Sequence, residues 1–141
     1  PSLEQRTAAA AGSAAVGLVG SSHWNTDFDN PVNTAFVKNF TDSYGRSPSV
    51  YASQGYDAAL LIGSALKASG GSLDPDSFRK GLLATDAKLT RGPFRFGPNQ
   101  HPVESWYQVK AEAGADGQVA LKTVGPIFEQ RGDSHSDACK L

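Results

Sequence analysis

The stretch from Ser47 to Gly71 constrains the fold most, because it predicts one long helix that is apolar on nearly all sides. Ser49 can cap its first turn, and the glycines at its end favour the left-handed conformation that terminates helices. Apolar residues at three- and four-residue spacing define the face expected to be buried, namely Tyr56, Ala59, Leu60, Gly63 and Leu66. Gly63 predicts close approach of a neighbouring element there. Because the other side is apolar too, we expect this helix to be sandwiched between layers.

The segments before this helix predict a strand and a second helix. Residues 14–20 (AAVGLVG) form a short apolar run bounded by glycines, which is typical of a buried strand. Residues 3–11 are alanine-rich and are interpreted as the end of a helix. From Pro31 to Tyr44 we expect an amphipathic helix, with Asn30 as its cap and Gly45 as its stop.

The C-terminal part changes from helical to alternating apolar spacing. A third helix is expected to begin near Pro75, with its apolar residues facing inward, namely Phe78, Leu82 and Leu83. Residues 106–111 and 119–124 then predict two strands joined by a hairpin at 115–117. The polar segment 131–141 is expected to be an irregular tail. This order of elements predicts an α/β fold with an antiparallel terminal part.

Composition describes a globular chain without a membrane or nucleic-acid signature. Hydrophobic residues make up 39% and charged residues 19% of 141 residues. The formal net charge of −1 gives no reason to expect nucleic acid as a partner, and no apolar run approaches the ~20 residues that span a bilayer. The chain contains no methionine, so we expect a processed product or a piece of a longer protein. Its one cysteine, Cys139, is either a free thiol or lacks its disulfide partner.

Signatures of catalysis and metal binding are weak or absent. The sequence lacks a phosphate-binding loop, a dinucleotide fingerprint, a zinc-protease motif and a nucleophile elbow. Ser22 and His23 place a hydroxyl beside an imidazole, but adjacent residues rarely reach the geometry of a nucleophile and its base. His135, Asp137 and Cys139 lack the spacing of a zinc site. We therefore expect no catalytic residue, no metal site and no cofactor, and an enzyme that uses Ser22 and His23 ranks third among the hypotheses.

Several aromatic and amide side chains suit a small-molecule cleft, which requires apolar walls and a few fixed hydrogen-bond groups. They lie on the polar loop after the predicted strand and on the first turns of the long helix, namely His23, Trp24, Tyr51, Gln54 and Tyr56. Trp24 is the strongest candidate, because a tryptophan in a polar loop needs a cover. A structural role competes for Tyr56, which lies on the apolar stripe, and for Asp57, which complements the helix dipole. For Tyr51 and Gln54 the sequence does not decide between a ligand-binding role and a structural role.

Three segments together resemble a known family: GLVGSSHW, then DNPVNTAFVKNFTDSYGRSPSVYASQGYDAALLIGSAL, then RGPFRFGPNQHP. From about Ala14 onward the chain is similar to the C-terminal third of the periplasmic solute-binding proteins that serve ABC importers of the branched-chain amino acid type. The SHW loop and the C-terminal cysteine look most similar to binders of aromatic acids. The resemblance implies the type I periplasmic-binding fold, in which two lobes with helices on a mainly parallel sheet are joined by three crossovers, with a C-terminal antiparallel hairpin.

The same resemblance implies export to the periplasm and delivery of a ligand to the membrane permease of an ABC importer, without catalysis. Family members are more than twice as long, so residues 1–141 are expected to contribute to both lobes of a larger protein. They are expected to associate with the missing N-terminal portion, where a partner of Cys139 would lie, or with themselves. The family's cleft lines up with Ser22, His23, Trp24 and the region from Tyr51 to Tyr56.

The leading hypothesis is therefore the solute-binding component of an ABC transporter. It captures a small organic ligand, an amino acid or an aromatic or other carboxylate, in a cleft between lobes. Trp24 would stack on the apolar part of the ligand, while His23, Tyr51 and Gln54 would supply hydrogen bonds. The alternative is a ligand-sensing domain of a receptor or regulator with the same fold.

Overall fold

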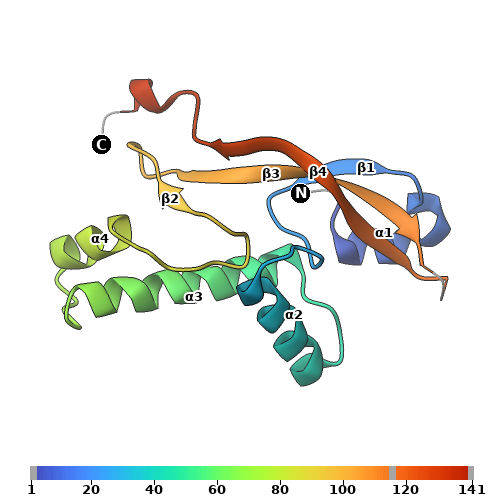
Figure 1. Cartoon of the computed structure of the whole chain (residues 1–141), viewed down its shortest axis with the longest axis horizontal. Helices are drawn as coiled ribbons and strands as arrows, with labels where there is room; N and C mark the ends of the chain where they lie inside the picture. Colours follow the sequence, from blue (N-terminus) through green and yellow to red (C-terminus); the bar gives the residue numbers. More distant parts are fainter. Residues whose placement is uncertain (1–2, 115–116, 140–141) are drawn as a thin grey trace.

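The computed structural model describes residues 3–114 and 117–139, which form a helical layer and a sheet layer (Figure 1). The helical layer contains α2 (Pro31–Tyr44), α3 (Val50–Ala68) and α4 (Pro75–Leu83). The sheet contains β1 (Val19–Ser22), β2 (Arg95–Phe96), β3 (Pro102–Ala113) and β4 (Val119–Arg131). The remaining helices are α1 (Gln5–Ala11) and the 3₁₀ turns η1 (Gly12–Ala15) and η2 (Ser136–Ala138). The α/β composition is as predicted, with α1 lying on the β3–β4 hairpin.

All the strand pairs in the described part of the chain are antiparallel, so the predicted mainly parallel sheet is wrong for these residues. β3 is the central strand: β1 pairs with it from Val19↔Lys110 to Ser22↔Tyr107, β2 pairs with its first residues, and β4 also pairs with it. β3 and β4 form the predicted hairpin, which closes at Ala113↔Val119; its tip at Ala115 and Asp116 lies outside the described residues. β4 is antiparallel to β3 because the hairpin reverses the chain, and β1 also runs opposite to β3.

Residues 14–20 do not form the buried strand that was predicted. Ala14 and Ala15 belong to η1, and β1 begins only at Val19. The side chains of Val16, Leu18 and Val19 are 46%, 52% and 55% exposed. Val16 and Leu18 precede the strand, and β1 has β3 as its one strand neighbour in the described chain, so that its other edge is also unpaired.

The C-terminal tail is more regular than predicted. β4 continues to Arg131 and is followed by η2, so the segment 131–141 that was expected to be irregular contains a strand end and a helical turn. Cys139, which follows η2, is exposed and carries a free thiol.

Helix α2 has the bounds that the sequence predicted. Asn30 caps it by accepting a hydrogen bond from the backbone N–H of Asn33 at 2.9 Å. Gly45 ends it in the left-handed conformation, with φ of 63°. Phe36 is the aromatic residue that the helix buries most, at 4% exposed. Local capping signals are therefore sufficient to define this helix.

Helix α3 begins as predicted, with the Ser49 hydroxyl accepting from the N–H of Ala52, but its buried face is not the predicted one. The buried residues are Val50, Ser53, Asp57 and Ala65. Tyr56, Ala59 and Gly63 are exposed. The helix is rotated in this way because Asp57 bonds to residues of the segment between α4 and β2, which runs back along α3 (Figure 1). In the described chain α3 is covered on one face and is not sandwiched.

The close helix contact that was predicted at Gly63 occurs at Gly81 instead. A Cβ atom at Gly81 on α4 would lie 2.7 Å from the carbonyl oxygen of Ala65 on α3, whereas at Gly63 it would meet nothing within 4 Å. Of the residues expected to face inward on α4, Phe78 and Leu82 are half-buried but Leu83 is 46% exposed. Gly81 is thus the residue that lets α4 dock on α3.

These two glycines form a matched pair for a stability measurement. We expect Gly81→Ala to lower the free energy of unfolding by about 1–3 kcal/mol, because the added methyl collides with backbone that cannot easily move. Gly63→Ala is expected to raise it by about 0.5–1 kcal/mol through better helix propensity. Urea unfolding of both variants checks this, and equal effects of the same sign would contradict the packing described here.

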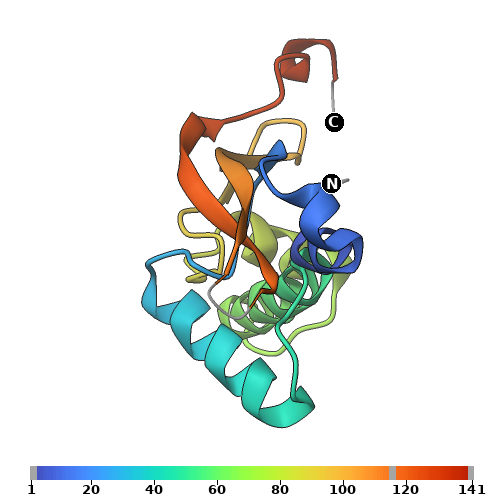
Figure 2. The ribbon, with the colours of Figure 1, turned by 90° about the vertical axis from the view of Figure 1, so that its right-hand side faces the viewer.

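The two layers have separate apolar clusters. The sheet-layer cluster consists of Ala8, Ala15, Val109, Ala111, Val119 and Leu121, and the helical-layer cluster consists of Trp24, Phe36 and Val50. Figure 2 shows the sheet standing above the helical layer, with α1 beside the hairpin. The contacts between the layers therefore involve loops and polar side chains, and the candidate site lies among them.

Candidate ligand-binding site

Asn33 in the first turn of α2 organises the loop that joins the two layers. Its side chain is fully buried, and Nδ2 donates to the carbonyl oxygens of Asn25, Thr26 and Phe28 at 3.2–3.3 Å. Its Oδ1 accepts from the indole N–H of Trp24 at 2.7 Å. Sequence reasoning missed Asn33, for which the one available signal was an asparagine in the first turn of a helix that follows a polar loop.

The side chain of Trp24 is buried by other residues of this chain. The residue is 4% exposed and packs with Val50 and with Phe36, whose ring centroid lies 6.2 Å from the indole in an edge-on arrangement. The hydroxyl of Ser22 donates to the Trp24 carbonyl oxygen at 2.7 Å, which fixes the start of the loop. Ser22 and Trp24 thus hold the loop in shape, with the indole facing the helical-layer cluster.

His23, between them, is directed toward helix α3. Its ring is 6% exposed, lies edge-on to Trp106 with centroids 5.1 Å apart, and places Nε2 at 3.3 Å from the side-chain nitrogen of Gln54. Because the amide nitrogen of Gln54 donates, Nε2 accepts and the ring proton belongs on Nδ1. Nδ1 has no hydrogen-bond partner among the described residues. The structure therefore brings together His23 and Gln54, two of the residues that the sequence singled out.

Burial lowers the pKa of His23, an effect that the nearby Glu104 carboxylate opposes and the Arg91 guanidinium reinforces. His23 is therefore harder to protonate in the folded protein than in the unfolded chain, where it takes up a proton around its ordinary pKa of 6.5. The free energy of unfolding should fall as the pH drops below this value. We expect His23→Gln to remove this part of the pH dependence in urea-unfolding series, and His101→Gln, at an exposed histidine, to retain it. An unchanged pH profile in His23→Gln would contradict the assignment.

A buried ion-pair bridge next to His23 joins the helical layer to the sheet. Arg91 donates from Nε to Asp57 on α3 and from Nη1 to Glu104 on β3, both at 2.9 Å. Asp57 also accepts from the backbone N–H and the hydroxyl of Thr90, at 2.8 and 3.0 Å. The Asp57 side chain is 2% exposed, and those of Arg91 and Glu104 are 10% and 12% exposed. This bridge holds α3 and β3 together beside the His23–Gln54 pair.

Tyr51 and Tyr56 lie on different sides of α3. Tyr51 is 62% exposed and lines an open recess between α1 and the start of α3. Tyr56 is 40% exposed and packs on Phe36 of α2, with ring centroids 4.8 Å apart. The structure therefore places Tyr51 near a recess between the two layers and Tyr56 against α2.

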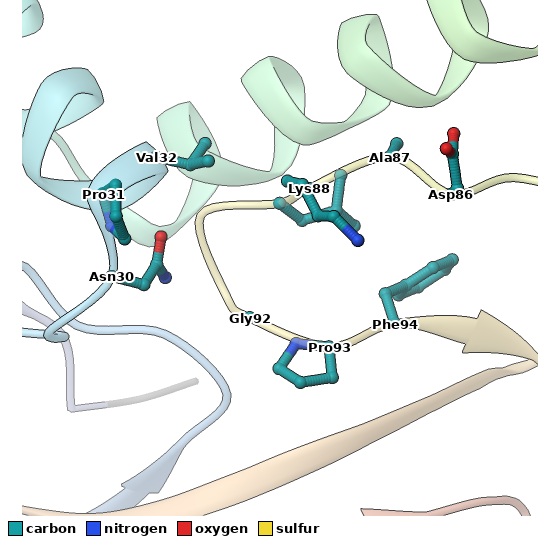
Figure 3. A pocket seen from close by; sticks show the side chains of 10 residues that line it. Asn30, Pro31, Val32, Asp86, Ala87, Lys88, Gly92, Pro93 and Phe94 are labelled. Atoms are coloured by element: carbon teal, nitrogen blue, oxygen red, sulfur yellow. The ribbon is translucent and has the colours of Figure 1, made fainter.

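A mostly apolar recess lies away from the predicted site residues. Its volume is about 510 Å³, and it is lined by the start of α2 and by the segment between α4 and β2 (Figure 3). The lining is mostly apolar and includes Pro31, Pro93 and Phe94, with Asp86 and Lys88 as its charged residues. No unpaired buried polar atom of the described chain belongs to its lining. The candidate binding groups are therefore at the junction of the layers rather than in this recess.

Other kinds of site find no support in the described part of the chain. The hydroxyl of Ser22 is bonded to a carbonyl rather than to His23, and residues 3–114 and 117–139 contain no cluster of metal-binding side chains. None of the helices in these residues is long and apolar enough to cross a membrane.

Comparison with solved structures finds relatives among ABC-transporter binding proteins. A solute-binding protein from R. palustris in complex with benzoate is 31% identical, with a TM-score of 0.81, over 90% of this chain and 34% of that one. A substrate-binding protein from Sphaerobacter thermophilus is 29% identical, with a TM-score of 0.82, over 90% and 35%. A solute-binding protein from Rhodopseudomonas palustris BisB5, in complex with 3,4-dihydroxybenzoic acid, is 26% identical, with a TM-score of 0.83, over 93% and 36%.

This chain thus spans about a third of the length of the relatives it matches. Among curated proteins, no match was found. Residues 1–118 match the protein family described as "Periplasmic binding protein", which confirms the resemblance inferred from the sequence and agrees with the expectation of a binding protein rather than an enzyme. The chain belongs to the periplasmic binding protein family.

Proposed function

We propose that this chain is part of the extracytoplasmic solute-binding component of an ABC importer. Its ligand is a small organic molecule, an amino acid or an aromatic or other carboxylate. Family membership and the two relatives in complex with benzoate and 3,4-dihydroxybenzoic acid support this function. Because the chain spans about a third of those relatives, the proposal concerns the complete protein, located in the periplasm and delivering its ligand to a membrane permease.

The observation that carries the proposal is the His23–Gln54 pair at the junction of the two layers. Gln54 is exposed on the first turns of α3 and can turn its amide to a ligand, while the buried ring of His23 orients it. Tyr51, one turn away and exposed, offers an aromatic wall and a hydroxyl. Ser22 and Trp24 support the site by holding the loop that carries His23, while Tyr56 packs on Phe36 of α2, on the other side of α3.

We propose further that the two apolar clusters belong to two lobes. The sheet-layer cluster and the helical-layer cluster are separate, and the chain passes between them at the loop after β1 and at the start of β3. Such an arrangement suits hinge closure, in which a ligand stabilises the closed state through contacts that the open state lacks. The exposed apolar side chains of β1 and α3 suit association with the remaining portion of the protein or with a second copy.

Calorimetric titration of the full-length gene product with benzoate, 4-hydroxybenzoate, 3,4-dihydroxybenzoate and the common L-amino acids tests the proposal. We expect saturable binding of at least one of these ligands, and a loss of about tenfold or more in affinity in Gln54→Ala. Lys67→Ala, at the far end of the same helix, is the control and should bind like the wild type. Failure of every ligand to bind would overturn the proposal.

A further inference from the structure

The loop between β1 and α2 is tied to strand β4, 96 residues further along the chain. Oδ2 of Asp27 accepts from the backbone N–H of Thr123 at 2.9 Å, and Oδ1 accepts from the hydroxyl of the same threonine at 2.6 Å. Nδ2 of Asn25 donates to Oδ1 of Asp27 at 2.8 Å and to the carbonyl oxygen of Leu121 at 3.1 Å. The carboxylate of Asp27 thus holds this loop to the sheet layer.

The same loop is also fixed to the helical layer. Nδ2 of Asn33 on α2 donates to loop carbonyl oxygens, including that of Thr26 at 3.2 Å, and Trp24 packs in the helical-layer cluster. The loop therefore has one set of contacts in each layer. Any movement of the two layers relative to each other must strain or break one of these sets.

The contacts between the layers differ in exposure, and this difference determines which of them can open. Asp27 is exposed and its bonds to Thr123 lie at the surface, so water can replace each partner when the contact opens. The bridge of Arg91 to Asp57 and Glu104 is buried, so its separation would leave buried charges without partners. The Asp27–Thr123 contact is therefore the cheaper of the two to break.

We propose that the Asp27–Thr123 contact is a latch that sets the balance between two arrangements of the layers, with the Arg91 bridge as the pivot. The inference rests on the proposed function and its hinge, and it adds the residues that regulate closure. Asp27 is a positioning residue in this account and is not part of the His23–Gln54 site. Removal of the latch weakens a ligand that favours the latched arrangement and strengthens a ligand that favours the unlatched one, because the two equilibria are linked.

Hydrogen exchange at the backbone N–H of Thr123 reports the state of the latch, because this group donates to Asp27. The measurement uses NMR of the ¹⁵N-labelled full-length gene product, with and without the tightest ligand of the panel of acids and amino acids named above. We expect saturating ligand to change the exchange rate of Thr123 by about fivefold or more. The N–H of Ala111, which donates to Leu18 within the sheet layer, is the control and should change by less than about twofold.

Calorimetric titration of Asp27→Ala with the same ligand measures the effect of the latch on affinity. We expect a change of about threefold or more, whose direction the exchange experiment fixes. Affinity should fall if the ligand slows the exchange of Thr123 and rise if the ligand speeds it. Thr123→Val, which removes the hydroxyl alone, should act in the same direction. Asp29→Ala, at an exposed carboxylate on the same loop, is the control and should stay within about twofold of the wild type.

The outcomes separate this inference from the proposed function. Unchanged exchange at Thr123, unchanged affinity in Asp27→Ala, or a change of affinity against the direction of the linkage would overturn the latch while the proposed function stands. If no ligand of the panel binds, the proposed function is overturned and the latch with it. If Asp27→Ala does not fold, the exchange of the wild type and the affinity of Thr123→Val decide by the same criteria.

Discussion

Replacement of Arg91 by methionine is expected to lower the free energy of unfolding by about 3–5 kcal/mol, the largest effect of any single substitution considered for this chain. Arg91 is the shared partner of two carboxylates, those of Asp57 and Glu104. Both carboxylates are almost fully buried, so removal of the guanidinium leaves two negative charges without a counter-ion and close to each other. Urea unfolding at neutral pH measures the loss.

An exposed ion pair and a neutral triple variant are the controls for this prediction. Lys38 and Asp42 on α2 pair in solvent, with side chains 72% and 60% exposed, so Lys38→Met should change stability by at most about 1 kcal/mol. Combining Arg91→Met with Asp57→Asn and Glu104→Gln removes all the charges of the bridge and should restore part of the lost stability. A loss in Arg91→Met no larger than that in Lys38→Met would show that the bridge does not join the layers.

The second large effect is expected at Asn33, where Asn33→Ala should cost about 3 kcal/mol, since each buried polar group left without a partner costs about 1–3 kcal/mol. The change removes the acceptor of the Trp24 indole N–H and the donor to the loop carbonyls, and both Asn33 and Trp24 are almost fully buried. Thermal and urea unfolding measure this cost, and the near-ultraviolet circular dichroism of Trp24 reports the loosened loop.

Asn39→Ala is the matched control for Asn33. Asn39 is exposed on the same helix, so its replacement by a better helix former should leave stability unchanged or raise it slightly. A similar small effect at both positions would contradict the view that Asn33 organises the loop. Because the loop carries His23, Asn33→Ala is also expected to weaken any ligand held by the His23–Gln54 pair.

Local signals in the sequence predicted the helices well. The bounds of α2 follow from a cap, a proline and a stop glycine, each of which acts within a few residues. The start of α3 at Ser49 follows from the same kind of signal. Such effects are readable from sequence because they do not depend on which distant segment lies next to the helix.

The buried face of α3 was predicted wrongly because a distant segment determines it. Apolar spacing favoured Tyr56, Ala59 and Gly63, but the helix turns Asp57 inward to meet Thr90 and Arg91, more than thirty residues away. The polar partners outweigh the apolar stripe, since a charged carboxylate is tolerated in the interior only where its hydrogen bonds are complete. The sequence contains no periodic signal for that pairing.

The pairing of strand β1 was also predicted wrongly because it depends on distant segments. The apolar run 14–20 has the composition of a strand buried in a parallel sheet, yet in the described chain β1 pairs antiparallel with β3 and leaves Leu18 and Val19 half-exposed. Strand composition predicts burial, but direction and pairing depend on which other strand is present. For a chain that spans about a third of its relatives, this information lies outside the residue pattern of 14–20.

The candidate site was predicted in part. The sequence pointed to the loop after β1 and to the start of α3, and the structure brings His23 and Gln54 from these two segments to 3.3 Å. It also buries Trp24 inside the helical layer, because Asn33 supplies a partner for the indole that could not be foreseen from spacing.

The most direct measurement is a two-dimensional NMR titration of the ¹⁵N-labelled full-length gene product with the tightest ligand of the panel. The account predicts saturable shifts of the side-chain amide of Gln54 and the imidazole of His23, with backbone shifts at Tyr51. The same dissociation constant should fit all three signals and agree with calorimetry. Shifts confined to the recess lined by Asp86, Lys88 and Phe94, or no shifts with any ligand, would contradict a binding site at the junction of the two layers.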